Sequence, residues 1–143
     1  MKATIAALTS AAALLGLAGA AQAGDLVVEL TGVQARPGKL YATLDTKETF
    51  FRQGGRSAVV DPQAGVTKVT FKDLPPGDYS FMLFHDENGD GKMAMGPTGM
   101  PGEGWALSNA EKLMGPPTYE VMKFSVPAEG AKVVVPVNYS SGG

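Results

Sequence analysis

The sequence predicts an all-β fold, an antiparallel β-sandwich of about seven strands with one long loop rich in Gly and Pro. Three observations support this fold class. Short runs alternate apolar and polar residues with a period of two, which is typical of half-buried strands. Clusters of Gly, Pro, Asp and Asn separate these runs. No long segment shows the 3.6-residue period of an amphipathic helix.

Seven runs are expected to be strands, at residues 25–31, 39–45, 56–60, 66–71, 79–84, 119–126 and 132–137. The Pro37-Gly38 turn between the first two runs predicts that they form a β-hairpin. The run 79–84 is apolar on both faces and therefore belongs in the middle of a sheet. Pro62 and Pro136 indicate that the third and last strands lie at sheet edges.

The N-terminus has the features of a secretory signal peptide, predicted to span residues 1–23. Lys2 gives a positive start, residues 6–21 are apolar, and the small residues Ala21 and Ala23 flank Gln22 at a cleavage site. The mature chain, residues 24–143, is expected to be a single domain that is periplasmic or secreted. It contains no second apolar run long enough to be an integral membrane segment.

Composition narrows the classes of partner and chemistry. The formal charge of −2, without a basic cluster, argues against nucleic acid or an anionic membrane as the partner. The partner is instead expected to be a protein or a glycan of unknown identity. Cysteine is absent, which excludes thiolate catalysis, zinc–thiolate sites and haem attachment through Cys.

The loop after the central run has the spacing of a calcium-binding loop. Asp86, Asn88 and Asp90 occupy positions one, three and five of an EF-hand-like sequence, and Gly91 stands at the sharp turn. Position twelve is Pro97, so Glu103, Glu111 or Glu87 would have to fold back to supply the bidentate carboxylate, and Glu103 is the first candidate. The alternative interpretation is an Asx-rich turn whose carboxylates accept backbone N–H groups.

Four further residues flank this loop and the Gly/Pro-rich segment. His85 is expected to be half-buried at the strand end, with a hydrogen bond to the Ser108-Asn109 segment. Trp105 is the expected packing anchor of the segment. Ser108 has Glu111 three residues later and is therefore expected to cap a short helical turn.

The methionines suggest a second kind of metal site. Met93, Met95 and Met100 lie close together in the sequence, with His85 and Met114 nearby. Soft thioether sulfurs suit Cu(I). The alternative is that these flexible side chains fill gaps where a loop packs over the core.

No motif for catalysis is present. The chain lacks Gly-x-Ser-x-Gly and His-Glu-x-x-His motifs and contains one histidine. We therefore expect a non-catalytic accessory or binding module. The competing interpretation is a sugar- or peptide-binding module that uses Trp105 with Tyr41 or Tyr119 as stacking surfaces.

Three stretches together resemble the bacterial exported family of domain-of-unknown-function (DUF) 2141 proteins: Leu74-Pro75-Pro76-Gly77-Asp78-Tyr79, the segment from His85 to Lys92, and the segment from Gly99 to Asn109. The resemblance implies an immunoglobulin-like or transthyretin-like β-sandwich and no established enzymatic activity. It marks His85, Gly91, Trp105, Ser108 and Asn109 as family-motif positions. Relatives are richer in Asp and Asn where this chain has Met93-Ala94-Met95-Gly96, so ligands donated there would be missing here.

Overall fold

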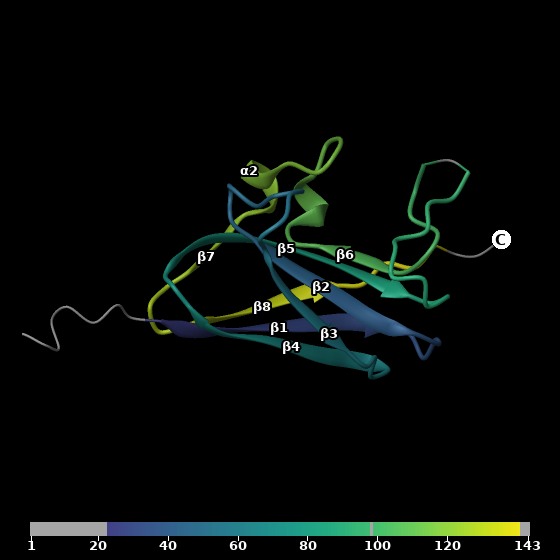
Figure 1. Ribbon diagram of the computed structural model, residues 1–143, viewed down its shortest axis with the longest axis horizontal. Coiled ribbons are helices and arrows are strands. Elements are labelled where there is room, and N and C mark those ends of the chain that lie inside the picture. The colour runs from purple at the N-terminus through teal and green to yellow at the C-terminus, as the bar shows by residue number, and fades with distance from the viewer. Residues whose placement is uncertain (1–22, 98, 141–143) are drawn as a thin grey trace, which may run out of the picture.

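This computed structural model describes residues 23–97 and 99–140. Its strands form two β-sheets that pack face to face (Figure 1). The smaller sheet has the strand order β4-β1-β8, formed by β4 (Gly65–Leu74), β1 (Gly24–Val33) and β8 (Ala131–Pro136). The larger sheet follows the order β3-β2-β5-β6, formed by β3 (Arg56–Val60), β2 (Lys39–Asp45), β5 (Gly77–Asp86) and β6 (Trp105–Leu107). A fifth strand of that sheet, β7 (Phe124–Val126), also pairs with β5. The predicted all-β sandwich is confirmed.

The core lies between the two sheets and follows the alternation of the strands. In β1, Leu26, Val28 and Leu30 are fully buried, as their spacing predicts. Their partners across the core are buried side chains of β2 and β5, namely Leu40, Ala42, Leu44, Phe81 and Leu83. Successive strand residues point to opposite faces, so one row of each strand packs inward and the other faces outward.

The predicted hairpin between the first two strands is wrong. β1 pairs with β4 and β8, whereas β2 pairs with β3 and β5, so the two strands lie in different sheets. Both strands bury one apolar row, and this pattern is the same whether two strands pair side by side or face each other across a core. The turn at Pro37-Gly38 therefore connects the two layers.

Other strands differ from the prediction in smaller ways. The run 119–126 begins as a short helix, α2 (Tyr119–Met122), and only its last three residues form β7. β6 was not predicted, so the described residues form eight strands where about seven were expected. A short 3-10 turn, η1 (Ala110–Lys112), follows β6. β8 runs parallel to β1 and not antiparallel. The two predicted sheet edges, at β3 and β8, are confirmed.

β5 lies in the middle of its sheet, between β2 and β6, as predicted. Its outward-facing side chains Met82 and Phe84 are only partly buried. They are covered by segments that enter and leave β6, which Figure 1 shows on the side of this sheet away from β1 and β4. The incomplete cover leaves a groove, described below.

The predicted signal peptide spans residues 1–23, of which residues 1–22 lie outside the described part of the chain. Among residues 23–97 and 99–140, no helix has the length and apolar character needed to span a bilayer.

Candidate functional site

The loop that follows β5 folds around the carboxylate of Asp86. Asp86 is the last residue of β5 and is 2% exposed. Its Oδ1 accepts the amide N–H of Gly89 at 3.1 Å, and its Oδ2 accepts that of Gly91 at 2.8 Å. Both glycines have positive φ, +75° and +73°, which bends the loop back over the carboxylate. The predicted turn at Gly91 is present.

Glu103 reaches the same place from the far end of the long loop. It is 5% exposed, its Oε1 accepts the Glu87 N–H at 3.2 Å, and its Oε2 accepts the Ala94 N–H at 3.2 Å. One oxygen each from Asp86, Asp90 and Glu103 lie within 4.8 Å of one another. We call these three side chains the carboxylate cluster. The structure therefore brings together Asp86 and Asp90, which the loop spacing predicted as ligands, with Glu103, the carboxylate proposed to complete the site.

The cluster has no cationic side chain as a partner. Among the ion pairs of the described residues, none includes Asp86, Asp90 or Glu103. Ionised carboxylates that lie this close to one another repel. A divalent cation offsets such repulsion, and carboxylate oxygens are ligands that Ca²⁺ prefers.

The other candidates for this site make different contacts. The Asn88 amide oxygen accepts the Asp90 N–H at 3.2 Å and the side chain is exposed at the rim of the cluster. Glu87 pairs with Arg36 at 3.1 Å and accepts the Gly104 N–H, so it braces the loop from outside. Glu111 lies exposed in η1.

His85 is fully buried and its ring makes its hydrogen bonds away from the Ser108-Asn109 segment, so that prediction is wrong in both respects. Its Nε2 lies 3.0 Å from the Pro37 carbonyl oxygen, and its Nδ1 lies 2.8 Å from the Tyr139 hydroxyl. A carbonyl can only accept, so Nε2 carries the proton and Nδ1 accepts from Tyr139. Burial raises the pKa of the Tyr139 phenol, which keeps this donor protonated. His85 thus holds the segment after β8 against β5.

Ser108 and Asn109 have a structural role that differs from the predicted helix cap. The N-cap residue of η1 is Asn109, and no side-chain capping bond forms. Ser108 is buried, where its hydroxyl donates to the Met122 carbonyl at 2.7 Å and accepts the Phe81 N–H at 3.0 Å. The Asn109 amide donates to three consecutive carbonyls, those of Val121, Met122 and Lys123. Both residues tie the end of β6 to α2 and β5.

An apolar groove of about 660 Å³ lies on the outer side of the five-stranded sheet. Its floor is formed by β5 and β6, one wall by the segment 93–101 and the other by residues 110–117 and Phe51. The floor and the first wall contribute the apolar side chains of Met82, Met93, Met95, Met100, Trp105 and Leu107. Trp105 is half-buried, so it is both the predicted anchor and part of an open surface.

The first wall is a short hairpin, residues 94–102. Met95 pairs with Pro101, the Gly96 N–H donates to the Met100 carbonyl at 2.7 Å, and the Gly102 N–H donates to the Ala94 carbonyl at 2.7 Å. Ala94 also donates to Glu103 of the carboxylate cluster. Ala94 at the base of the hairpin therefore connects the carboxylate cluster to the wall of the groove.

The structure changes the membership of the predicted methionine group. His85 is buried elsewhere, and Met114 is completely exposed and does not line the groove. Met82, which sequence reasoning assigned to a covered face of β5, joins Met93, Met95 and Met100 instead. The signal that was available is its alternation with Phe81 and Leu83, which places it on the outer face of the sheet.

An aromatic row crosses the same face of the sheet. Tyr41 of β2 lies opposite Phe84 of β5, and Phe84 lies opposite Trp105 of β6. The rings of Tyr41 and Phe84 are stacked, with centroids 5.2 Å apart and an interplanar angle of 9°. Tyr41 and Trp105 therefore share one face, as the binding-module interpretation requires.

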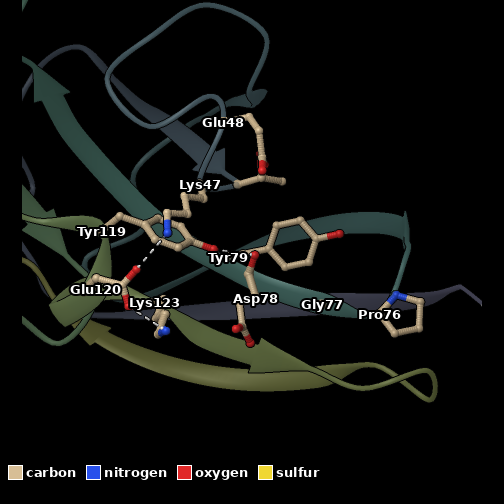
Figure 2. A pocket seen from close by; sticks show the side chains of 10 residues that line it. Lys47, Glu48, Pro76, Gly77, Asp78, Tyr79, Tyr119, Glu120 and Lys123 are labelled. Atoms are coloured by element: carbon tan, nitrogen blue, oxygen red, sulfur yellow. Dashed lines mark hydrogen bonds and ion pairs between the residues drawn. The ribbon is translucent and has the colours of Figure 1, made fainter.

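Tyr119 lies away from this row, in a second hollow of about 360 Å³ between α2 and the start of β5 (Figure 2). Its hydroxyl donates to the Asp78 carbonyl at 2.9 Å. Glu120 lies between Lys47 and Lys123, at 3.5 and 2.7 Å. Tyr119 lines this hollow and Trp105 lines the apolar groove, so the two rings do not form one stacking surface.

Comparison with known proteins places the chain in a family and assigns no activity to it. The bacterial family described as "Uncharacterized protein conserved in bacteria (DUF2141)" matches residues 28–134. This match covers most of the chain, including the carboxylate cluster and the groove, and it confirms the resemblance seen in the three sequence motifs. Neither a curated protein nor a solved structure matches the chain.

Proposed function

This chain belongs to the DUF2141 family, and we propose that it acts as an exported, non-catalytic binding module whose working surface is stabilised by Ca²⁺. One observation carries this proposal. The carboxylate cluster of Asp86, Asp90 and Glu103 lies at the base of the hairpin that forms one wall of the apolar groove. An ion at the cluster would hold that wall in place. Export is supported by the predicted signal peptide.

The calcium site would use oxygens only. Asp86 and Glu103 are buried and held by backbone N–H groups, whereas Asp90 is exposed and gives the ion a path from solvent. Asn88, at the rim, would contribute an amide oxygen, and water or backbone carbonyls would complete the six to eight ligands that Ca²⁺ takes. Loops of exported modules function with weak affinity, so an EF-hand-like spacing without its twelfth-position glutamate is compatible with this role.

We expect millimolar Ca²⁺ to raise the melting temperature, because an ion that binds only the folded state stabilises it by mass action. The double variant Asp86→Asn plus Asp90→Asn keeps the shape of both side chains but removes two charges, and it should abolish the rise. Thermal unfolding in Ca²⁺ and in chelator measures the difference. Glu129→Ala, which removes an exposed carboxylate outside the cluster, is the control and should keep the rise. Identical wild-type curves in both solutions would contradict the proposal.

The ligand that best fits the groove is an extended peptide with apolar side chains. Four methionines, two leucines, a phenylalanine and three prolines line the groove beside Trp105. Flexible thioether side chains adapt to different apolar shapes, and methionine-rich surfaces are typical of proteins that bind several sequences. The groove offers few polar groups to the hydroxyls of a sugar. The aromatic row is what favours the alternative, a glycan stacked on Tyr41 and Trp105.

Trp105 is the single tryptophan, so its fluorescence reports on the groove directly. Titration with an apolar, methionine- and leucine-rich peptide should shift its emission to shorter wavelength, because a bound peptide excludes water from the indole. Tyr41→Ala should leave that response unchanged, since Tyr41 does not line the groove. A response to oligosaccharides that disappears in Tyr41→Ala would favour the glycan instead.

A further inference from the structure

We propose that the four methionines of the groove, Met82, Met93, Met95 and Met100, form a binding site for one soft monovalent cation, Cu(I). This inference goes beyond the proposed function, because it depends on sulfur and not on apolar shape. It rests on the proposed function only in placing the binding surface at the groove. Met82 comes from β5, Met95 and Met100 come from the hairpin, and Met93 directly precedes it.

The distribution of methionine favours a ligand over simple gap filling. Six methionines lie within the described residues, and Met122 is the one that is fully buried in the core. Met114 is completely exposed. The remaining four converge on a single groove from two separate parts of the chain. In that groove Met95 and Met100 are 60% and 58% exposed, so their thioethers do not fill a gap in packing.

The chemistry of the groove selects a soft ion. Thioether sulfur is a neutral, polarizable ligand that suits Cu(I), and carboxylate oxygen suits hard cations such as Ca²⁺. No Asp, Glu or His is among the described side chains that line the groove. The hard ligands are gathered in the carboxylate cluster instead. The molecule therefore separates oxygen ligands and sulfur ligands into two neighbouring places.

Two features of the groove assist binding of a cation. The hairpin bonds between Gly96 and Met100 and between Gly102 and Ala94 fix the backbone that carries two of the thioethers, those of Met95 and Met100, which lowers the entropy lost on binding. The Trp105 indole borders the same space, and the face of an indole attracts a cation placed over it. Because the chain has no Cys, methionine is its only source of sulfur ligands.

The test uses Ag(I), a redox-stable ion with the same preference for sulfur, and Cu(I) kept reduced under anaerobic conditions. We expect the wild-type mature protein to bind one ion, seen by native mass spectrometry and by quenching of Trp105 fluorescence. The variant with all four residues changed from Met to Leu keeps the apolar volume of the groove and should lose the ion. Met114→Leu removes an exposed thioether outside the groove and should bind as the wild type does.

Absence of ion binding by the wild type, or equal binding by the fourfold Leu variant, would overturn the inference. If the fourfold variant does not fold, Met95→Leu plus Met100→Leu replaces it, since both side chains are exposed and their loss should weaken Ag(I) binding without unfolding the protein. Binding of the apolar peptide separates the two proposals. Wild-type protein that binds Ag(I) but no peptide would refute only the proposed function, and wild-type protein that binds peptide but no ion would refute only this inference.

Discussion

Replacing Gly38 by Ala should lower the free energy of unfolding by about 2–5 kcal/mol. Gly38 has φ of +94°, a conformation that costs an L-residue about 1–2 kcal/mol. An added Cβ would also overlap the carbonyl oxygen of Asp86 and lie 3.0 Å from the Glu87 Cα. These neighbours are backbone atoms, so relief of the overlap must displace the backbone of Asp86, where the loop after β5 begins. Such overpacking costs about 1–3 kcal/mol more.

Gly89→Ala is the matched control for Gly38→Ala. Gly89 has a similar φ of +75°, but nothing lies within 4 Å of the position of an added Cβ. The free energy of unfolding of Gly89→Ala should therefore fall only by the conformational cost of about 1–2 kcal/mol. Urea unfolding of both variants measures the difference, which isolates the contact between the Gly38 turn and Asp86. Equal losses in the two variants would show that this contact is unimportant.

Replacing His85 by Phe should destabilise the protein by about 1–3 kcal/mol, because two part-buried hydrogen bonds are lost at about 0.5–1.5 kcal/mol each. The Pro37 carbonyl loses its donor and the Tyr139 hydroxyl loses its acceptor. The segment that carries Tyr139 should then open more often. Hydrogen exchange at Asn138, whose N–H donates to the Trp105 carbonyl at 2.7 Å, should become faster.

Tyr139→Phe separates the two hydrogen bonds of His85. This variant removes the hydroxyl but keeps the ring under Arg36, whose guanidinium carbon lies 4.5 Å from the ring centroid. The bond from His85 to Pro37 also remains, so the expected loss is smaller, about 0.5–1.5 kcal/mol. If His85→Phe unfolds at the same urea concentration as the wild type, His85 is not the link between β5 and the C-terminal segment.

Much of the fold is visible in the sequence because a strand half buried in a sandwich must alternate. The spacing of Leu26, Val28 and Leu30 showed which side of β1 faces the core, and the two apolar faces of β5 placed it at the centre of a sheet. The partners of each strand were not visible. Alternation indicates which face is buried, and it contains no information about which neighbour supplies the hydrogen bonds.

The candidate site was predictable where ligand spacing is local, and not where it depends on packing. Asp86 and Asp90 lie on one turn, so their spacing predicted their proximity. Ser108 has the spacing of a cap, but pairing of β6 with β5 buries it next to Phe81. Met82 lies on the second apolar face of β5, and the sequence does not reveal that the segments over this face leave a groove there. Only the tertiary arrangement joins Met82 to the other three methionines.

The parallel pairing of β1 with β8 has a consequence for the order in which the molecule folds. β1 is the central strand of its sheet, and one of its two neighbours is the last strand of the chain. Contacts between such distant segments form slowly, because a long loop must close before they are made. The residue after Val137, Asn138, also bridges Trp105 at one side of the groove. A chain emerging from its N-terminus would therefore leave one edge of β1 unpaired, and the binding surface incomplete, until β8 and Asn138 had been made.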